Sequence, residues 1–235
     1  MKKYLLLTAT FSFFFISYSQ QTGSFSTNDF ERFRNLSYNS SSLLLDKSIK
    51  KIQGSPYLFD NWDTNSKVYI EDAVYKLTSV NFNVEHDRFE VKFEEDSVLI
   101  INPLIIKRAE INKKMFIPMK NENDSGITFF EELVSMKNFI LLKHYYVKIK
   151  EGVLNPMTQQ QIKPDKYIKY EDYFLKINDH EVEPIKLNKS SILKLIDDKF
   201  KDKVKNYAKQ QKINYKNESE LKNVLEYYNS LLNEP

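Results

Sequence analysis

The middle of the chain alternates apolar and polar side chains, which is the period of a β-strand. Phe82 and Val84 alternate with asparagines, and after a charged turn at 85–88 the alternation resumes with Phe89 and Val91. One face of such a strand pair is apolar and the other polar, as in an antiparallel sheet that covers a core with one face. We therefore predict a hairpin over this stretch.

Other strands are predicted from the same pattern. One hairpin is expected around the acidic pair Glu71 and Asp72, and a last one around the turn Glu171 and Asp172. Further strands are predicted at 98–101, 109–111, 115–119, 127–134, 139–149, 167–170 and 173–177. A glutamine-containing connector, punctuated by glycine and proline, is expected at 152–164.

The tail changes to the helical period. The residues of the predicted inner faces are Ile192, Leu195, Ile196, Phe200, Val204, Tyr207 and Ala208, and then Leu221, Val224, Leu225, Tyr228 and Leu232. Asn217 followed by Glu220 forms a capping-box pair at the start of the second helix. The predicted fold class is α+β: a mainly antiparallel β body at 46–187, a meander of hairpins, followed by a C-terminal α-helical pair. This amphipathic helical tail at 188–235 is expected to pack on the β body.

The first residues have the pattern of a secretory signal peptide at 1–19. Lys2 and Lys3 precede an uncharged apolar run at 4–16, and Ser17 and Ser19 are the small residues before the cleavage site. The run is shorter than the roughly 20 apolar residues that a membrane-spanning helix needs. We therefore expect an exported chain whose leader is removed.

The residues after this leader are polar and rich in serine. We predict a mobile polar leader at 20–45, because the stretch has no sustained apolar period. A short helix is predicted at 43–52, ending before Gly54.

Composition limits the compartment and the partners. The chain has no cysteine, so it can hold neither a disulfide nor the lipid-bearing cysteine of a bacterial lipoprotein. Its net charge is +3, of which Lys2 and Lys3 contribute two, so the mature chain is nearly neutral and has no nucleic-acid footprint. Aromatic residues make up 14% of the chain, which favours packed strands over disorder.

One stretch has oxygen-bearing residues at the spacing of calcium ligands. Asn121, Asn123, Ser125, Gly126 and Glu132 fall at positions 1, 3, 5, 6 and 12 of an EF-hand-like loop. Position 1 is Asn where the motif has Asp, and the residues before it predict a strand. A polar turn between strands is therefore the favoured interpretation, and we predict no metal site.

The side chains of common catalytic sites are few and scattered. His86, His144 and His180 lack metal-ligand spacing, and no G-x-S-x-G elbow is present. His144 lies in an apolar strand and is expected to be a buried structural histidine. We predict no catalytic, cofactor-binding or metal-binding residue.

Adjacent carboxylates are candidates for a hydrolytic pair. The three pairs are Glu94 with Glu95, Glu131 with Glu132, and Asp197 with Asp198. A glycosidase needs two carboxylates several ångströms apart across a cleft, whereas neighbouring residues point in different directions. Solvated faces are therefore the favoured interpretation.

The segment 189–212 carries eight lysines against three aspartates. Such a helix can meet an acidic partner, lipid headgroups or an anionic polysaccharide. The favoured interpretation is the lysine-covered outer face of an ordinary amphipathic helix.

The segment 55–62 holds the only tryptophan, Trp62, close to Tyr57 and Phe59. Aromatic residues beside turn-forming residues can make a binding lip. Packing of the segment over the start of the sheet is favoured.

Four stretches of the sequence carry a family resemblance: G-S-P-Y-L at 54–58, N-F-N-V-E-H-D-R-F-E-V at 81–91, F-F-E-E-L at 129–133 after a glycine, and V-L-E-Y-Y-N-S-L at 224–231. They resemble a family of secreted envelope proteins of Bacteroidota that carries no catalytic assignment. The resemblance covers most of the mature chain with loose motifs. It implies a periplasmic or outer-membrane-associated site in a diderm bacterium and adds no mechanism.

The functional expectation is an exported, non-enzymatic envelope protein that binds another macromolecule, within an outer-membrane or secretion assembly. A periplasmic carrier of a small apolar ligand is one alternative, and a carboxylate-dependent hydrolase acting on envelope polysaccharide is another. A protein partner is expected and nucleic acid is not. The lysine-rich helix is a candidate for peripheral association with a membrane. No transmembrane helix is expected in the mature chain.

Overall fold

The computed structural model describes residues 43–44, 52–94, 97–120, 126–178 and 182–233. The predicted signal peptide and most of the predicted leader lie outside these residues. So do Asn121, Asn123 and Ser125 of the calcium-like spacing, and His180.

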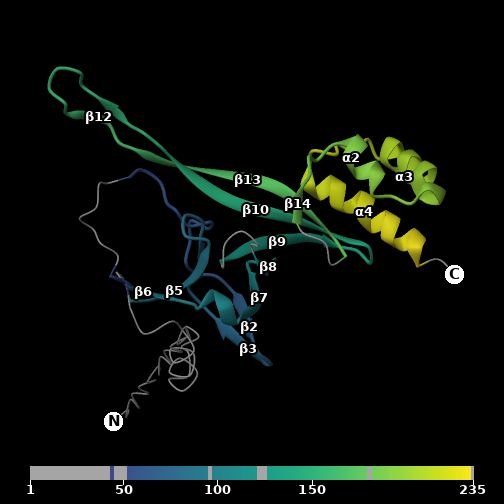
Figure 1. The fold of residues 1–235 in the computed structure, drawn as a ribbon, viewed down its shortest axis with the longest axis horizontal. Helices are drawn as coiled ribbons and strands as arrows, with labels where there is room; N and C mark the ends of the chain where they lie inside the picture. Colours follow the sequence, from purple (N-terminus) through teal and green to yellow (C-terminus); the bar gives the residue numbers. More distant parts are fainter. Residues whose placement is uncertain (1–42, 45–51, 95–96, 121–125, 179–181, 234–235) are drawn as a thin grey trace, which may run out of the picture.

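Two antiparallel sheets make up most of the fold (Figure 1). The four-stranded sheet has the order β1-β6-β5-β4, with β1 (Leu43–Leu44), β4 (Val80–Asn83), β5 (Arg88–Glu94) and β6 (Ser97–Ile100). The eight-stranded sheet has the order β14-β13-β10-β9-β8-β7-β2-β3. Its strands are β2 (Ser66–Ile70), β3 (Ala73–Leu77), β7 (Ile106–Ile111), β8 (Lys114–Lys120), β9 (Ile127–Ser135), β10 (Phe139–Lys150), β13 (Lys166–Ile177) and β14 (Val182–Pro184). A short 3₁₀ helix, η2 (Pro103–Ile105), leads into β7.

A first core fills the space between the two sheets. Four phenylalanine rings lie at its centre, with centroids 4.8 to 6.3 Å apart, and all four are fully buried. These rings belong to Phe82, Phe89, Phe116 and Phe129. Each full burial contributes roughly 1.5–3 kcal/mol. The alternation seen in the sequence therefore places these side chains on the inner faces, and the hairpins predicted around 71–72 and 85–88 are confirmed.

A second core joins the helices to one end of the long β10–β13 hairpin. The helices are α2 (Lys189–Lys194), α3 (Asp198–Gln210) and α4 (Glu218–Leu232). Their buried residues pack with Met136, Phe139, Leu141 and Leu175 from the strands. The α+β class, an antiparallel body followed by C-terminal helices, is confirmed. Among the described residues, no helix is both long and apolar enough to cross a membrane.

The first predicted helix is interrupted, although its inner face is correct. The α2 helix ends at its C-cap Leu195, and Asp197, with φ −56° and ψ 140°, starts α3. The Asp197 N–H donates a hydrogen bond of 3.3 Å to the buried hydroxyl of Tyr228 in α4, so tertiary packing stabilises the break. In α4 the fully packed residue near the C-terminus is Leu231, where Leu232 was predicted.

Two local predictions are wrong. No hairpin turns at Glu171 and Asp172, because β13 runs straight through them and pairs residue by residue with β10 from Phe139 opposite Ile177 to Lys150 opposite Lys166. The short helix at 43–52 fails in its described part, where Leu43–Leu44 pairs with β6 as a strand. In both places strand pairing with a distant segment outweighs local turn or helix signals.

Candidate functional site

The β10–β13 hairpin extends beyond its neighbours in the eight-stranded sheet as an arm, defined here as residues 144–172 (Figure 1). The pairing of β9 with β10 ends at Lys143, and the pairing of β14 with β13 ends at Phe174. One side of the arm is braced by the segment after residue 52, where the Gln53 N–H donates to the Asp165 carbonyl at 2.7 Å. The Tyr167 hydroxyl also donates to Glu85 at 3.1 Å. The far end of the arm continues past these braces.

That far end, called the tip (residues 152–163), is a turn held by local hydrogen bonds. It contains the two short strands β11 (Val153–Leu154) and β12 (Gln161–Lys163). The Asn155 carboxamide oxygen accepts hydrogen bonds from the N–H groups of Met157 (2.9 Å) and Thr158 (3.2 Å). The Asn155 N–H in turn donates to the carbonyl of Gln160 at 2.8 Å. The predicted connector is therefore an ordered hairpin end, held by the local bonds that asparagine offers in turns.

The tip exposes apolar side chains. Met157 at its apex is 93% exposed, Ile162 is 59% exposed and Leu154 is 52% exposed. None of the tip residues belongs to either core. Grouped apolar exposure of this kind marks an interaction site more often than a scattered surface leucine does.

Gly152 allows the two strands of the tip to approach each other. A Cβ atom at this position would lie 1.9 Å from the carbonyl oxygen of Lys163. We therefore expect Gly152→Ala to open the tip and to speed hydrogen exchange of the Asn155 amide at least tenfold, while the urea midpoint of global unfolding stays within error. The neighbouring change Glu151→Ala is the control and should leave exchange unaltered. Protection in Gly152→Ala equal to that of the parent would contradict this account.

A second candidate site is a cluster of charges between the two cores. Glu131 on β9 is only 6% exposed, and its carboxylate accepts hydrogen bonds from Lys114 at 2.8 and 3.0 Å and from the Tyr145 hydroxyl. Burial and the Glu131 carboxylate both raise the pKa of Tyr145. Tyr145 therefore stays a neutral donor, and the negative charge of Glu131 is matched by Lys114.

The same cluster continues across β10 toward β13 and the helices. Lys143, 4% exposed, forms an ion pair with Glu218 at the start of α4 and a longer one of 3.4 Å with Glu171 on the arm. The Tyr173 hydroxyl donates to Glu218 at 2.6 Å. Burial raises the pKa of Glu218, but the hydrogen bonds from Lys143 and Tyr173 and the nearby lysine charges outweigh it, so the pKa is lowered overall. These side chains link the helical unit to the sheet.

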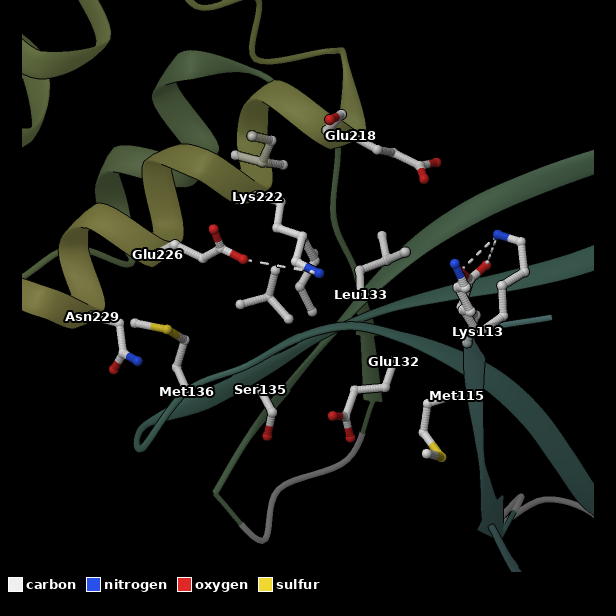
Figure 2. A pocket seen from close by; sticks show the side chains of 16 residues that line it. Lys113, Met115, Glu132, Leu133, Ser135, Met136, Glu218, Lys222, Glu226 and Asn229 are labelled. Carbon is white, nitrogen blue, oxygen red and sulfur yellow. Dashed lines mark hydrogen bonds and ion pairs between the residues drawn. The ribbon is translucent and has the colours of Figure 1, made fainter. Parts of the chain in front are cut away.

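An open groove of about 580 Å³ lies beside this cluster, between α4 and the strands β8 and β9. Figure 2 shows Glu132 and Met115 on the strand side and Lys222 and Glu226 on the helix side, with the last two joined by an ion pair of 3.9 Å. The walls thus carry both signs of charge. In the cluster, the acid and base side chains already bind one another, which is the arrangement of a structural link.

The carboxylate prediction needs one correction. Glu131 does not belong to a solvated face, because Lys114 and Tyr145 satisfy its charge inside the protein. Asp197 and Asp198 are solvent-exposed, as predicted. The sequence signal that could have found Glu131 is a charged residue directly after two phenylalanines in an apolar strand.

The remaining predicted features fall at separate places. His86 is exposed in the β4–β5 turn, whereas His144 is half-buried on the arm, where burial lowers its pKa against the opposing charge of Asp172. Glu132 lies inside β9, so the calcium-like spacing ends in a strand. Among the residues that the structure describes, no group of His, Cys, Asp or Glu is arranged to hold a metal ion.

The segment 55–62 packs on the four-stranded sheet, as favoured from its sequence. The Leu58 N–H donates to the Phe82 carbonyl at 2.9 Å, and Leu58 and Phe59 contact the first core. The ring of Trp62 packs edge-on against Tyr57 with centroids 4.6 Å apart. These aromatic residues hold the sheet edge.

The lysine-rich helix α3 buries Val204 and Ala208 in the second core and carries its lysines outward. Two of them pair with aspartates one turn away, Lys201 with Asp198 at 2.5 Å and Lys205 with Asp202 at 3.3 Å. This is the arrangement of an ordinary amphipathic surface helix.

Comparison of the chain with models of known protein families, with curated proteins and with solved structures found no significant match. The resemblance to secreted proteins of Bacteroidota therefore stays a prediction.

Proposed function

We propose that the chain is an exported, non-enzymatic component of the cell envelope that binds another macromolecule through the tip of its arm. Export is supported by the signal-peptide pattern at 1–19. Binding is supported by the form of the arm, which holds a compact end away from both cores.

The observation that carries this proposal is the ordered apolar tip. Its turn is held by Asn155 and Gly152, so Leu154, Met157 and Ile162 stay exposed in a defined arrangement. An unstructured loop would show a similar composition without this fixed geometry. A fixed apolar projection loses less conformational entropy on binding, which favours a recognition element.

The two alternatives have weaker support. A carrier of a small apolar ligand would need room between the sheets, and four phenylalanine rings occupy the centre of that space. A carboxylate-dependent hydrolase is favoured by one observation, the carboxylates of Glu132 and Glu226 on opposite sides of the groove (Figure 2). Against it, Glu131 and Glu218 beside the groove are both held by lysine and tyrosine.

The test is photo-crosslinking from the tip in native envelopes. A benzophenone amino acid at position 157 should give an adduct, because this side chain is the most exposed apolar one of the tip. The matched control places the same group at Leu104, an apolar residue of the β body that is 66% exposed. Adducts at 157 that disappear when Leu154 and Ile162 are changed to Asp would support the proposal, and equal yields at 157 and 104, or none at 157, would refute it.

A further inference from the structure

The charge pattern around the tip identifies the class of its target. No charged residue occurs between Val153 and Ile162. Directly behind this charge-free segment lie four lysines, Lys148, Lys150, Lys163 and Lys166, all of them exposed. From these observations we propose a target that goes beyond the function proposed above but uses the same tip: the tip inserts shallowly into the headgroup region of a bilayer that contains anionic lipid.

The lysines are placed at a cost to the folded arm. Lys150 lies directly opposite Lys166 in the ladder of β10 and β13. Like charges at opposite positions of a strand pair repel each other and destabilise it. Two acids lie nearby: Glu151 is exposed next to Lys150, and Asp165 accepts a hydrogen bond from the Gly152 N–H at 2.7 Å. The four lysines therefore remain in excess. A negatively charged surface in front of these lysines would relieve the repulsion.

Several polar groups of the tip find partners within the turn. Beyond the bonds of Asn155, the Gln159 N–H donates to the Asn155 carbonyl at 2.8 Å. The Gln159 side chain donates to the Pro156 carbonyl at 3.2 Å, and the Gln161 side chain lies 3.4 Å from Asp165. Backbone groups that find partners inside a segment can leave water without a large penalty, which is the condition for entering a lipid interface.

The size of the tip favours lipid over protein as the target. A stable protein interface of standard size uses roughly 20–30 residues on each side. The charge-free segment spans only positions 153–162. A bilayer surface needs no complementary shape to bind a protein. The apolar residues of the tip would contact the upper part of the acyl chains, and the lysines behind them would contact the lipid phosphates.

The lysine-rich helix α3 lacks the apolar half of this arrangement. Its apolar residues pack against the second core, Val204 and Ala208 fully and Phe200 and Tyr207 in part, so its outer face carries mainly charged side chains. The helices also lie at the opposite end of the β10–β13 hairpin from the tip (Figure 1). Insertion of the tip would therefore hold the helical unit and the groove away from the membrane surface.

The test uses the absence of cysteine in the chain. Met157→Cys introduces a single thiol that can carry the fluorophore NBD, and Leu104→Cys provides the matched position on the β body. With vesicles of phosphatidylcholine and phosphatidylglycerol (3:1), we expect a blue shift and increased emission at 157 and neither at 104. Vesicles of phosphatidylcholine alone should give at least tenfold weaker binding. All variants share the same N-terminus, so its apolar run cannot produce a difference between the two probe positions.

Charge and apolar contributions are then separated. Lys150→Gln with Lys166→Gln is expected to weaken vesicle binding roughly 25-fold, at about fivefold for each lysine. Lys194→Gln with Lys209→Gln removes the same charge from the helices and should change binding less than twofold. In the chain labelled through Leu154→Cys, Met157→Asp should weaken binding at least tenfold.

Lack of an emission change at 157 with anionic vesicles, or equal losses in the two lysine pairs, would overturn the lipid assignment. If the photo-crosslinker at 157 then captures a protein in native envelopes, the proposed binding function stands with a protein as its target. If it captures nothing, both proposals fail.

Discussion

Replacing Lys143 by alanine is expected to destabilise the protein by roughly 3–5 kcal/mol, the usual cost of removing one partner from a buried ion pair. The ammonium is nearly inaccessible to water, and it is paired with Glu218 and Glu171. It also lies 5.2 Å and 5.7 Å from the ring centroids of Tyr145 and Tyr173. Without it, the partly buried carboxylate of Glu218 loses its main counter-charge.

The measurement is urea unfolding followed by two signals. The fluorescence of Trp62 reports on the sheet body, and circular dichroism at 222 nm reports on the helices. Because Lys143 joins α4 to β10, the helical signal should be lost at lower urea than the tryptophan signal. Lys107→Ala is the control, since its pair with Asp72 is 3.5 Å long and exposed at both ends, and it should change stability by less than about 0.5 kcal/mol.

Two further variants separate charge from volume. Lys143→Met retains most of the side-chain length and should still destabilise, because Glu218 remains without its partner. Adding Glu218→Gln to Lys143→Met should restore part of the loss, since the uncompensated charge is then removed. If Lys143→Ala cost no more than Lys107→Ala, the structural role assigned to the charge cluster would be wrong.

The second large effect is a loss of stability as pH rises, caused by Asp87 in the β4–β5 turn. Burial raises the pKa of this carboxyl to about 7, although hydrogen bonds from Phe129 and Thr128 act in the opposite direction. Both of its oxygens lie 3.2 Å from the Phe129 nitrogen on β9, so the side chain joins the two sheets. In the unfolded chain the same carboxyl titrates near its ordinary value of about 3.9.

The sign follows from proton binding. Between about pH 4 and pH 7 the folded protein holds a proton that the unfolded chain has lost, so stability falls as pH increases through this window. Above pH 7 the loss of folding stability caused by ionised Asp87 is constant, at most about 4 kcal/mol for a pKa shift of this size. Asp87→Asn keeps an oxygen that can accept from Phe129 but cannot ionise. It should therefore be more stable than the parent at pH 8, and the advantage should vanish by pH 4.

The measurement is the difference in unfolding free energy between the parent and Asp87→Asn across this range. Titrating groups that the two proteins share contribute equally to both and cancel in the difference. A difference that does not change between pH 4 and pH 8 would show that Asp87 has an ordinary pKa in the folded protein.

Local periodicity was sufficient where each strand meets its sequence neighbour. The hairpins around 71–72 and 85–88 and the inner face of α4 follow from the spacing of apolar residues, because adjacent strands and single helices bury one regular face. The Asn217 cap is also visible in the sequence, and its side chain accepts from the Glu220 N–H at 3.1 Å. Local signals failed at Glu171 and Asp172, because these residues predict a turn but lie within a continuous strand.

The candidate sites divide in the same way. The charge-free segment at 153–162 and the lysines beside it are visible in the sequence, but their exposure is not, since a connector of this composition could equally fold back on the body. The cluster of Glu131, Lys143 and Glu218 combines residues from three elements. No spacing rule connects such positions, because only the packing of α4 against the strands brings them together.

By itself, the order of residues determined the α+β class, the hairpins between neighbouring strands and the amphipathic faces of the helices. These depend on regular periods that a short window of sequence contains. Only the tertiary structure decided that β10 and β13 form one long arm, that the helices break at Asp197 and that Glu131 is buried. Each of these depends on the free energy of pairing or packing with a segment far along the chain, which outweighs the local preference.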